Sequence, residues 1–383
     1  MSYLARRYQV ISIVLAILFT AGLIPVAAQG AELVLESPAY VLMEPVSGEV
    51  IAEKNPHQKM EPASVTKLMT LVVAVEALDA GKVKLTDKVA VSENAWKMGG
   101  AQIYLEKGEE MTYNDLLASI AVGSANDSCV AVAEHLYGTQ EEFVRVMNQR
   151  ARELGMNDTN YVNCHGLHTD GHYTSAYDQA LLSQYAVTRP ELMKLTSTKE
   201  YDIRKMHLYN HNKLLWWYPG SDGLKTGWHP QANYCLAATS VRDGMRLVAV
   251  TLGAPQPRGN FRDCMKLMNL GFARYSYQPM VEPGQGFGFL KVKKGRVERV
   301  NVVAADKGGA LMIKGGPGDV TTQLELPSLI EAPVNAGQKV GEVVIYRQQQ
   351  EVQRVTLVAE DDVPRGSFLS FFADFMYDMT KMK

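Results

Sequence analysis

A continuous apolar run near the start of the chain is the first feature of its hydrophobic pattern. The run covers residues 10–24 and directly follows Arg6 and Arg7. At about 15 residues it is short for a membrane-spanning helix, which needs about 20, and a positive start before such a run is typical of a signal peptide. We therefore predict a signal peptide over residues 1–28, cleaved after the small residue Ala28. An uncleaved N-terminal anchor is the alternative.

Residues 32–278 combine strand and helix patterns in one segment. Strands are predicted at 40–43 and 48–51 and, as buried Val-, Leu- and Ala-rich runs, at 234–240 and 247–253. Apolar residues at helical spacing predict helices over 65–78, 116–136 with a break at 123–126, 141–154, 175–187 and 260–277. Ser175 and Asp178 match a capping box at the start of one of them. Helices between flanking strands predict an α+β domain in which helices cover a sheet.

The pattern changes twice towards the C-terminus. Residues 279–365 have no helical period, and short Val-rich runs at 299–304, 339–346 and 352–358 are separated by Gly-Gly and Gly-Pro pairs, which predicts a small all-β domain. In residues 366–383 bulky apolar side chains return at helical spacing: Phe368, Leu369, Phe371, Phe372, Phe375, Met376, Met379 and Met382. This amphipathic helix either packs on its own protein or lies on a membrane surface, and its aromatic face favours the membrane.

Composition narrows the class of protein. The chain has 383 residues, 46% of them apolar, which excludes intrinsic disorder. Lys and Arg number 39 against 41 Asp and Glu, and this balance of charge argues against a nucleic-acid partner. The four cysteines are too few for a disulfide scaffold and lack zinc-site spacing, so we expect buried thiols and no metal; one disulfide stays open in an exported chain.

Ser64 and Lys67 form the first motif that could carry chemistry. A serine at a helix start and a lysine three residues later lie on the same helical face. The lysine amine can then take the serine proton if burial or a neighbouring cation lowers its pKa. The helix N-terminus also favours developing negative charge. Alone, this spacing is a weak signal that occurs often by chance, and it favours a serine that simply caps a helix.

Two further motifs follow at a distance. Ser124-Ala125-Asn126 interrupts an apolar stretch, where a hydroxyl and an amide need partners. Lys225-Thr226-Gly227 directly precedes a predicted buried strand. A Lys and a Thr at a strand edge can bind a carboxylate, and the glycine permits the close approach of a ligand backbone. Alone, the first reads as a loop between helices and the second as a surface turn.

Together and in this order, the three motifs resemble the active-site set of serine penicillin-binding proteins and serine β-lactamases. The wider text is more specific and resembles the low-molecular-mass D-alanyl-D-alanine carboxypeptidases, peptidase family S11. The similar segments are Pro62-Ala63-Ser64-Val65-Thr66-Lys67-Leu68-Met69-Thr70, Glu153-Leu154-Gly155-Met156, Asn163-Cys164-His165-Gly166-Leu167 and Asp222-Gly223-Leu224-Lys225-Thr226-Gly227. The resemblance extends from about residue 33 to the C-terminal helix.

The resemblance implies a fold and an activity. The implied order is a signal peptide, a β-lactamase/transpeptidase-like α+β domain, a β-rich domain and an amphipathic helix that binds the membrane. The implied enzyme is a serine-type carboxypeptidase at the outer face of the bacterial cytoplasmic membrane. It removes the terminal D-alanine of peptidoglycan stem peptides, β-lactam antibiotics inhibit it, and it needs no cofactor.

The resemblance also implies roles for individual residues. Ser64 is the nucleophile, Lys67 its general base, and Ser124 relays the proton to the leaving amine. The remaining residues bind substrate: Asn126 the substrate backbone, Lys225 and Thr226 the terminal carboxylate, and the backbone N–H groups of Ser64 and Trp228, beside Gly227, the oxyanion. His165 and Asp178 read as supporting residues.

The chain departs from the family pattern after the third motif. Trp228 is followed by His229, and Asn233 stands where glycine is usual. Arg258 and Arg262 are both candidates for a further contact with the substrate carboxylate, and the sequence does not decide between them.

Three other functions share these motifs. A β-lactamase needs a glutamate in an E-x-x-L-N pattern to activate water, and none is present: Glu153 begins Glu-Leu-Gly-Met-Asn. An endopeptidase acting on peptidoglycan crosslinks remains an alternative. A penicillin-binding sensor would not need both the Lys67 base and the Ser124 relay, so we expect an enzyme.

Overall fold

A five-stranded antiparallel sheet forms the centre of the first domain. In the computed structural model, which describes residues 33–366, its strand order is β2-β1-β9-β8-β7. The buried apolar runs of β8 and β9 are explained by their central position, where both faces of the sheet are covered. The strands are β1 (Ala39–Glu44), β2 (Glu49–Lys54), β7 (Ser221–His229), β8 (Asn233–Arg242) and β9 (Met245–Ala254).

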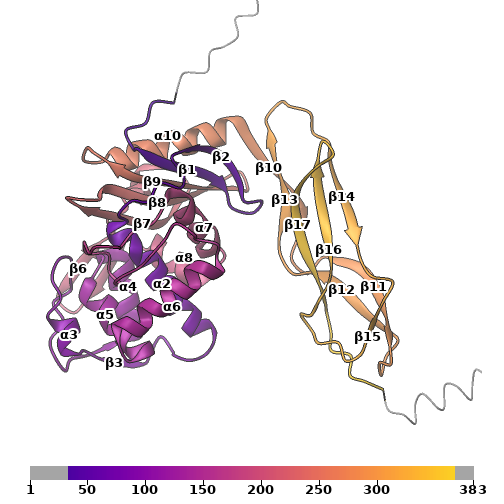
Figure 1. The fold of residues 1–383 in the computed structure, drawn as a ribbon, viewed down its shortest axis with the longest axis horizontal. Coiled ribbons are helices and arrows are strands. Elements are labelled where there is room, and N and C mark those ends of the chain that lie inside the picture. The colour runs from indigo at the N-terminus through magenta and orange to yellow at the C-terminus, as the bar shows by residue number, and fades with distance from the viewer. Residues whose placement is uncertain (1–32, 367–383) are drawn as a thin grey trace, which may run out of the picture. The chain divides into compact units, whose positions relative to one another are not determined.

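Helices cover this sheet on its two sides, with α10 (Gly259–Arg274) on one side and α7 (Ala176–Ala186) on the other (Figure 1). Helix α2 (Lys67–Asp79) is buried around nearly its whole circumference, because α4, α5, α6, α7 and α8 all pack on it. The predicted α+β organisation of this domain is therefore confirmed. The other helices are the 3-10 helix η1 (Ala63–Thr66), α3 (Glu93–Trp96), α4 (Tyr113–Gly123), α5 (Asn126–Tyr137), α6 (Gln140–Glu153), α8 (Pro190–Ser197) and α9 (Leu214–Trp217).

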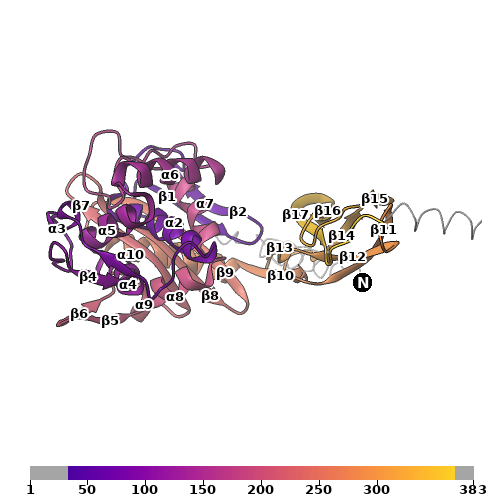
Figure 2. The same ribbon diagram turned by 90° about the horizontal axis from the view of Figure 1, so that it is seen from below.

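Two small hairpins complete the domain. Strand β3 (Lys88–Ala90) pairs with β4 (Glu110–Thr112), and β5 (Glu200–Ile203) pairs with β6 (Met206–Tyr209). The second hairpin packs on α4, close to α9 (Figure 2). It thereby holds the segment that leads from α8 into α9 and β7.

Side-chain caps set several helix starts. The predicted capping box forms only in part: the Asp178 backbone N–H donates to Ser175 Oγ at 3.1 Å, as expected. The Asp178 carboxylate instead accepts from the Asp158 backbone N–H at 2.8 Å and from the Thr159 hydroxyl at 2.7 Å. Asp178 therefore ties α7 to the loop before it, which agrees with the supporting role expected of it.

The second domain is all-β. Residues 279–364 contain no helix, as predicted, and a six-stranded sheet has the order β14-β16-β17-β12-β11-β15 beside the pair β10–β13. The helix predicted to reach Tyr277 ends at Arg274, and Tyr275 already begins β10, ahead of the expected boundary at 279. The strands are β10 (Tyr275–Val281), β11 (Gly286–Lys293), β12 (Arg299–Ala304), β13 (Gly308–Ile313), β14 (Val320–Glu325), β15 (Leu329–Glu331), β16 (Lys339–Arg347) and β17 (Gln350–Ala359).

The cysteines are free and fully buried, as expected for structural thiols: Cys129, Cys164, Cys235 and Cys264. The predicted signal peptide (1–28) and nearly all of the predicted C-terminal helix (366–383) lie outside the described residues. Within residues 33–366 no helix has the length and apolar character needed to cross a bilayer.

Candidate active site

Ser64 and Lys67 meet at the junction of η1 and α2. Ser64 lies in the 3-10 turn, and Lys67 begins the α-helix. The Lys67 Nζ donates to Ser64 Oγ at 2.9 Å and to the His165 backbone carbonyl at 2.5 Å. Burial lowers the pKa of Lys67, because the charged amine is removed from water. A neutral amine is the form that can take a proton from Ser64, and burial favours that form.

The turn that carries Ser64 is braced from outside. Ala63 has a left-handed backbone, with φ of 47°, and its carbonyl accepts from the Thr66 hydroxyl at 2.8 Å. The Thr66 oxygen in turn lies 2.8 Å from His172 Nε2. Gly166 passes so close that a Cβ there would stand 2.0 Å from the Ala63 carbonyl oxygen. Strained backbone at this position is typical of a functional site that its surroundings hold in place.

Ser124 and Asn126 occupy the break between α4 and α5. Ser124 has a left-handed backbone, with φ of 59°, and its Oγ accepts from the Lys225 Nζ at 3.1 Å. The Asn126 side-chain N–H donates to the Gly99 carbonyl at 2.7 Å. The Asn126 Oδ1 is buried, and no group within residues 33–366 bonds to it. A buried acceptor without a partner is costly, so this oxygen is available for a donor on a ligand.

Lys225 and Gly227 come from strand β7. Lys225 is buried, and that burial, followed by the nearby charge of Lys67, lowers its pKa to about 7. Gly227 lies directly against the backbone of the turn that carries Ser64. A Cβ at this position would lie 2.6 Å from the Pro62 carbonyl oxygen and 3.0 Å from the Ser64 nitrogen. The absence of a side chain thus brings β7 against the turn that carries the serine.

These residues surround a cavity of about 500 Å³. Its lining is Ser64, Gly100, Ala101, Ser124, Asn126, Gly166, Leu167, His211, Thr226, Gly227, Trp228, His229, Tyr234, Asn260 and Phe261. Of the eight site residues predicted from the sequence, six line the cavity directly. The other two, Lys67 and Lys225, are buried and hydrogen-bonded to Ser64 and Ser124. The structure therefore brings all eight together.

The chemical character of the cavity follows from its lining. None of the lining residues is a carboxylate, whereas two buried lysines bond to the hydroxyls at its wall. Such a site favours an anionic ligand and a nucleophilic serine. It lacks an acid that could activate water in the way expected of a β-lactamase.

The two departures in the third motif have local explanations. Asn233 adopts a left-handed backbone with φ of 57°, a conformation that asparagine tolerates better than most residues. His229 accepts from the Ala232 backbone N–H at its Nδ1, so its Nε2 carries the proton and points to the Glu61 carboxylate at 3.3 Å. Trp228 is exposed, and its ring lies 5.9 Å from that of Tyr234.

Neither candidate arginine lines the cavity. Arg262 pairs with Glu36, with its Nη2 2.8 Å from the carboxylate. Arg258 lies over the ring of Trp217, with 5.6 Å between the guanidinium carbon and the ring centroid.

His211 is a cavity residue that sequence reasoning missed. It stands between Asn210 and Asn212, whose buried side chains bond to backbone carbonyls of α8 and β7. Burial, with smaller contributions from the charges of Lys225 and Lys213, lowers the pKa of His211 to about 4. The only sequence signal for His211 was a polar Asn-His-Asn run directly before an apolar segment. Such a run is common in loops and does not indicate a functional residue.

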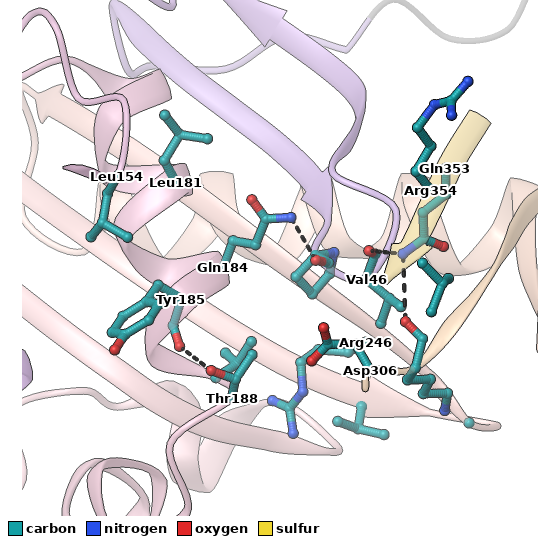
Figure 3. Close-up of a pocket in the computed structure, with 16 residues that line it drawn as sticks. Val46, Leu154, Leu181, Gln184, Tyr185, Thr188, Arg246, Asp306, Gln353 and Arg354 are labelled. Carbon is teal, nitrogen blue, oxygen red and sulfur yellow. Dashed lines mark hydrogen bonds between the residues drawn. The ribbon is translucent and has the colours of Figure 1, made fainter. Parts of the chain in front are cut away.

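A second cavity, of about 680 Å³, contains none of the predicted site residues. Its lining includes α7 and the turn after β1, which are joined by a bond from Gln184 to the Pro45 carbonyl at 2.7 Å (Figure 3). The facing serine and lysine, Ser64 and Lys67, lie at the first cavity instead.

Two family models match most of the chain. A model described as D-alanyl-D-alanine carboxypeptidase matches residues 26–256. A model described as penicillin-binding protein 5, C-terminal domain, matches residues 275–365. The two matches correspond to the sheet-and-helix domain and to the all-β domain.

Individual relatives agree with these models. D-alanyl-D-alanine carboxypeptidase DacF of Bacillus subtilis is 38% identical over 359 residues, covering 92% of each chain. DacC of Escherichia coli, also a D-alanyl-D-alanine carboxypeptidase, is 33% identical over 363 residues, covering 91% of each.

Solved structures are similar too. Penicillin-binding protein 5 of Haemophilus influenzae is 32% identical, with a TM-score of 0.71, and the match covers 87% of this chain and 98% of that one. Penicillin-binding protein D2 of Listeria monocytogenes in its ampicillin-bound form is 31% identical, with a TM-score of 0.58, and the match covers 63% of this chain and 99% of that one.

Proposed function

The chain belongs to the D-alanyl-D-alanine carboxypeptidase family, and we propose that it removes the terminal D-alanine of peptidoglycan stem peptides through an acyl-enzyme on Ser64. Ser64 Oγ attacks the carbonyl carbon between the last two D-alanines. Neutral Lys67 takes the hydroxyl proton as the new C–O bond forms. The support is the 2.9 Å contact between Lys67 and Ser64, together with the burial that disfavours the charged amine.

The tetrahedral intermediate then breaks down to the acyl-enzyme. Its oxyanion accepts from the backbone N–H groups of Ser64 and Trp228. The C–N bond breaks, and the proton that Lys67 took from Ser64 passes through the Ser124 hydroxyl to the leaving amine, so that Lys67 is neutral again and Lys225 keeps its charge. The 3.1 Å contact from the Lys225 amine to the Ser124 hydroxyl oxygen supports this relay, because it orients the hydroxyl that passes the proton on. D-Alanine leaves, and the shortened peptide remains esterified to Ser64.

Substrate binding uses the remaining residues of the cavity. The open Oδ1 of Asn126 accepts from a backbone N–H of the peptide. Thr226 and the cationic form of Lys225 bind the terminal carboxylate. Water then attacks the ester with Lys67 again taking the proton, which releases the peptide. A β-lactam also forms an ester on Ser64 but leaves slowly, because the amine released by opening its ring stays attached to the acyl group and blocks water, whereas D-alanine departs.

The reaction and its nucleophile are tested together. Mature protein is incubated with diacyl-Lys-D-Ala-D-Ala, and free D-alanine is measured beside the Ser64→Ala variant. In parallel, benzylpenicillin is added and the mass of the intact protein is recorded. We expect D-alanine release and a penicilloyl adduct, both absent from the variant. No release by folded wild-type protein, or steady hydrolysis of benzylpenicillin, would refute the proposal.

We also propose that the protein acts at the outer face of the cytoplasmic membrane. The support is the apolar run at residues 10–24 behind two arginines and the aromatic amphipathic pattern of residues 366–383. The test is fractionation of cells that produce the full chain or a chain ending at residue 366. The full chain should sediment with membranes and the shortened chain should be soluble outside the cytoplasm; equal distribution of the two would contradict the membrane role.

A further inference from the structure

Two neighbouring tryptophans on α9 face outwards. In this short helix Leu214 and Leu215 are 0% and 6% exposed, whereas Trp216 and Trp217 are 39% and 45% exposed. Tryptophan is normally well buried, and two exposed rings side by side leave apolar area in water. Since the leucine pair already anchors the helix, the tryptophans are free to contact something else.

Three cations lie against these rings. The Lys213 and Lys199 amines stand 4.9 Å and 5.8 Å from the centroid of Trp216, and Arg258 lies over Trp217. None of the three forms an ion pair with an acid in the described part of the chain. We call these five residues, Lys199, Lys213, Trp216, Trp217 and Arg258, the basic aromatic surface.

The acids that follow Lys199 along the chain have another partner. Glu200 and Asp202 both bond to His207, at 3.3 Å and 2.6 Å. None of the three cations is therefore paired with an acid of the described residues, and stacking on an aromatic face leaves most of their N–H groups open to an outside partner.

The basic aromatic surface is held in a fixed shape. Asn212 accepts from the Leu214 backbone N–H at 3.1 Å and donates to the Gly223 carbonyl at 2.8 Å, which ties α9 to β7. The Lys213 amine donates to the Asn210 carbonyl at 3.1 Å. A surface with few freely rotating groups loses little conformational entropy when it binds a ligand.

The basic aromatic surface adjoins the catalytic cavity. The ring of Trp217 meets that of Phe261 edge-on, with 5.6 Å between centroids, and Phe261 lines the cavity. On the other side Lys213 follows His211, another lining residue, by two positions. A polymer with one stem peptide in the cavity would therefore have its neighbouring parts near this surface.

We propose that the basic aromatic surface binds the peptidoglycan strand that carries the stem peptide. This inference rests on the proposed function and extends it from the scissile bond to the polymer. Carboxylates of the stems pair with Lys199, Lys213 and Arg258, and the apolar faces of the sugar rings stack on Trp216 and Trp217. Charge complementarity and continuity with the cavity favour this occupant over other anions.

The test separates binding of the polymer from cleavage of the peptide. Full mature protein and the variant Lys199→Glu/Lys213→Glu/Arg258→Glu are compared for D-alanine release from soluble diacyl-Lys-D-Ala-D-Ala and from sacculi stripped of teichoic acid. A matched control, Lys82→Glu/Lys84→Glu/Lys88→Glu, makes the same change in charge at exposed lysines outside the surface. Co-sedimentation with sacculi is measured in the Ser64→Ala background, so that binding is read without turnover.

We expect the first variant to lose about tenfold or more in sedimentation and in release from sacculi, while release from the soluble peptide stays within about twofold. The control should behave as wild type, and added salt should weaken only wild-type and control binding. A Trp216→Ser variant should show a smaller loss of the same kind.

Three results would overturn the inference. If the first variant loses D-alanine release equally from soluble peptide and from sacculi, its catalytic cavity is damaged. If the control variant loses as much sedimentation as the first variant, the effect is one of net charge. Sedimentation with phosphatidylglycerol vesicles but not with sacculi, lost in the first variant and kept in the control, would assign the surface to a lipid. Failure of the proposed function is distinguishable, because wild-type protein would then release no D-alanine from the soluble peptide while sedimentation could still be measured.

Discussion

The two domains treat positive charge in opposite ways. In the catalytic domain Lys67 and Lys225 are buried, and their amines bond to hydroxyls and carbonyls rather than to carboxylates. In the all-β domain Arg354 is exposed and contacts three glutamates. Burial lowers the pKa of both lysines, whereas the glutamates raise the pKa of Arg354. The buried lysines have shifted pKa values suited to proton transfer, whereas the exposed Arg354 only forms ion pairs at the surface.

Replacing Lys67 should have the largest effect. In Lys67→Met the side chain keeps its length and loses its base, so acylation by substrate should fall by about 10³-fold or more. A buried polar amine is replaced by an apolar side chain of similar length, so the melting temperature should stay within about 3 °C of wild type. D-Alanine release and thermal unfolding measure the two effects. Unfolding of the variant at ambient temperature would show that the lysine is structural.

A Cβ at Gly227 should have the next largest effect. In Gly227→Ala the methyl group meets the Pro62 carbonyl and the Ser64 nitrogen, so β7 must move away from the serine. A displacement of this size should reduce the rate of benzylpenicillin acylation by about 10²-fold. Gly286→Ala is a control for the loss of a glycine, since no atom stands within 4 Å of its added Cβ and its backbone is not left-handed. Equal rates for the two variants would contradict the close approach.

The pH profile tests the two buried lysines against each other. Lys67 must be neutral to act as a base, so kcat/KM should rise with pH until its lowered pKa is passed. Lys225 must be charged to bind the carboxylate, so kcat/KM should fall above about pH 7, where its pKa lies. The expected profile is a bell with limbs of up to tenfold per pH unit. Lys225→Arg should remove the alkaline limb. If the limb persists in this variant, it is caused by a group other than Lys225.

Removing the exposed cation should have the smallest effect. Arg354→Ala loses ion pairs that water and salt already weaken, so the melting temperature should fall by less than about 3 °C and activity should not change. A thermal scan at low and high salt measures this. A large fall in melting temperature would show that the ion pairs of Arg354 are not weak surface contacts, which would contradict the comparison between the domains.

Features that depend on nearby residues were predictable from the sequence. Ser64 and Lys67 are three residues apart, and helical geometry alone places them together. The strands β1, β2, β8 and β9 follow from short apolar runs between turns, and the all-β character of residues 279–364 follows from the missing helical period. The C-terminal end of α10 was misjudged, because apolar spacing continues past Arg274 into residues that pair with β13 instead.

Features that depend on distant residues were not predictable from local patterns. Lys225 and Ser124 are 101 positions apart, and only the resemblance to a family linked them. The backbone carbonyl of His165, rather than its ring, holds Lys67, and no sequence pattern reveals which backbone atoms a lysine contacts. His211 enters the cavity because Asn210 and Asn212 are tied to other elements, and that requires the folded chain.

The bare backbone at Gly227 also limits how this enzyme can evolve drug resistance. Any side chain there would displace the Ser64 amide, which in the proposed mechanism binds the carbonyl oxygen of both substrate and β-lactam. Selection cannot exclude the drug at this point without excluding the substrate. The neighbouring Trp228 is under no such restriction, because its ring is exposed and the proposed mechanism uses only its backbone N–H. Resistance substitutions should therefore accumulate at position 228 and spare position 227.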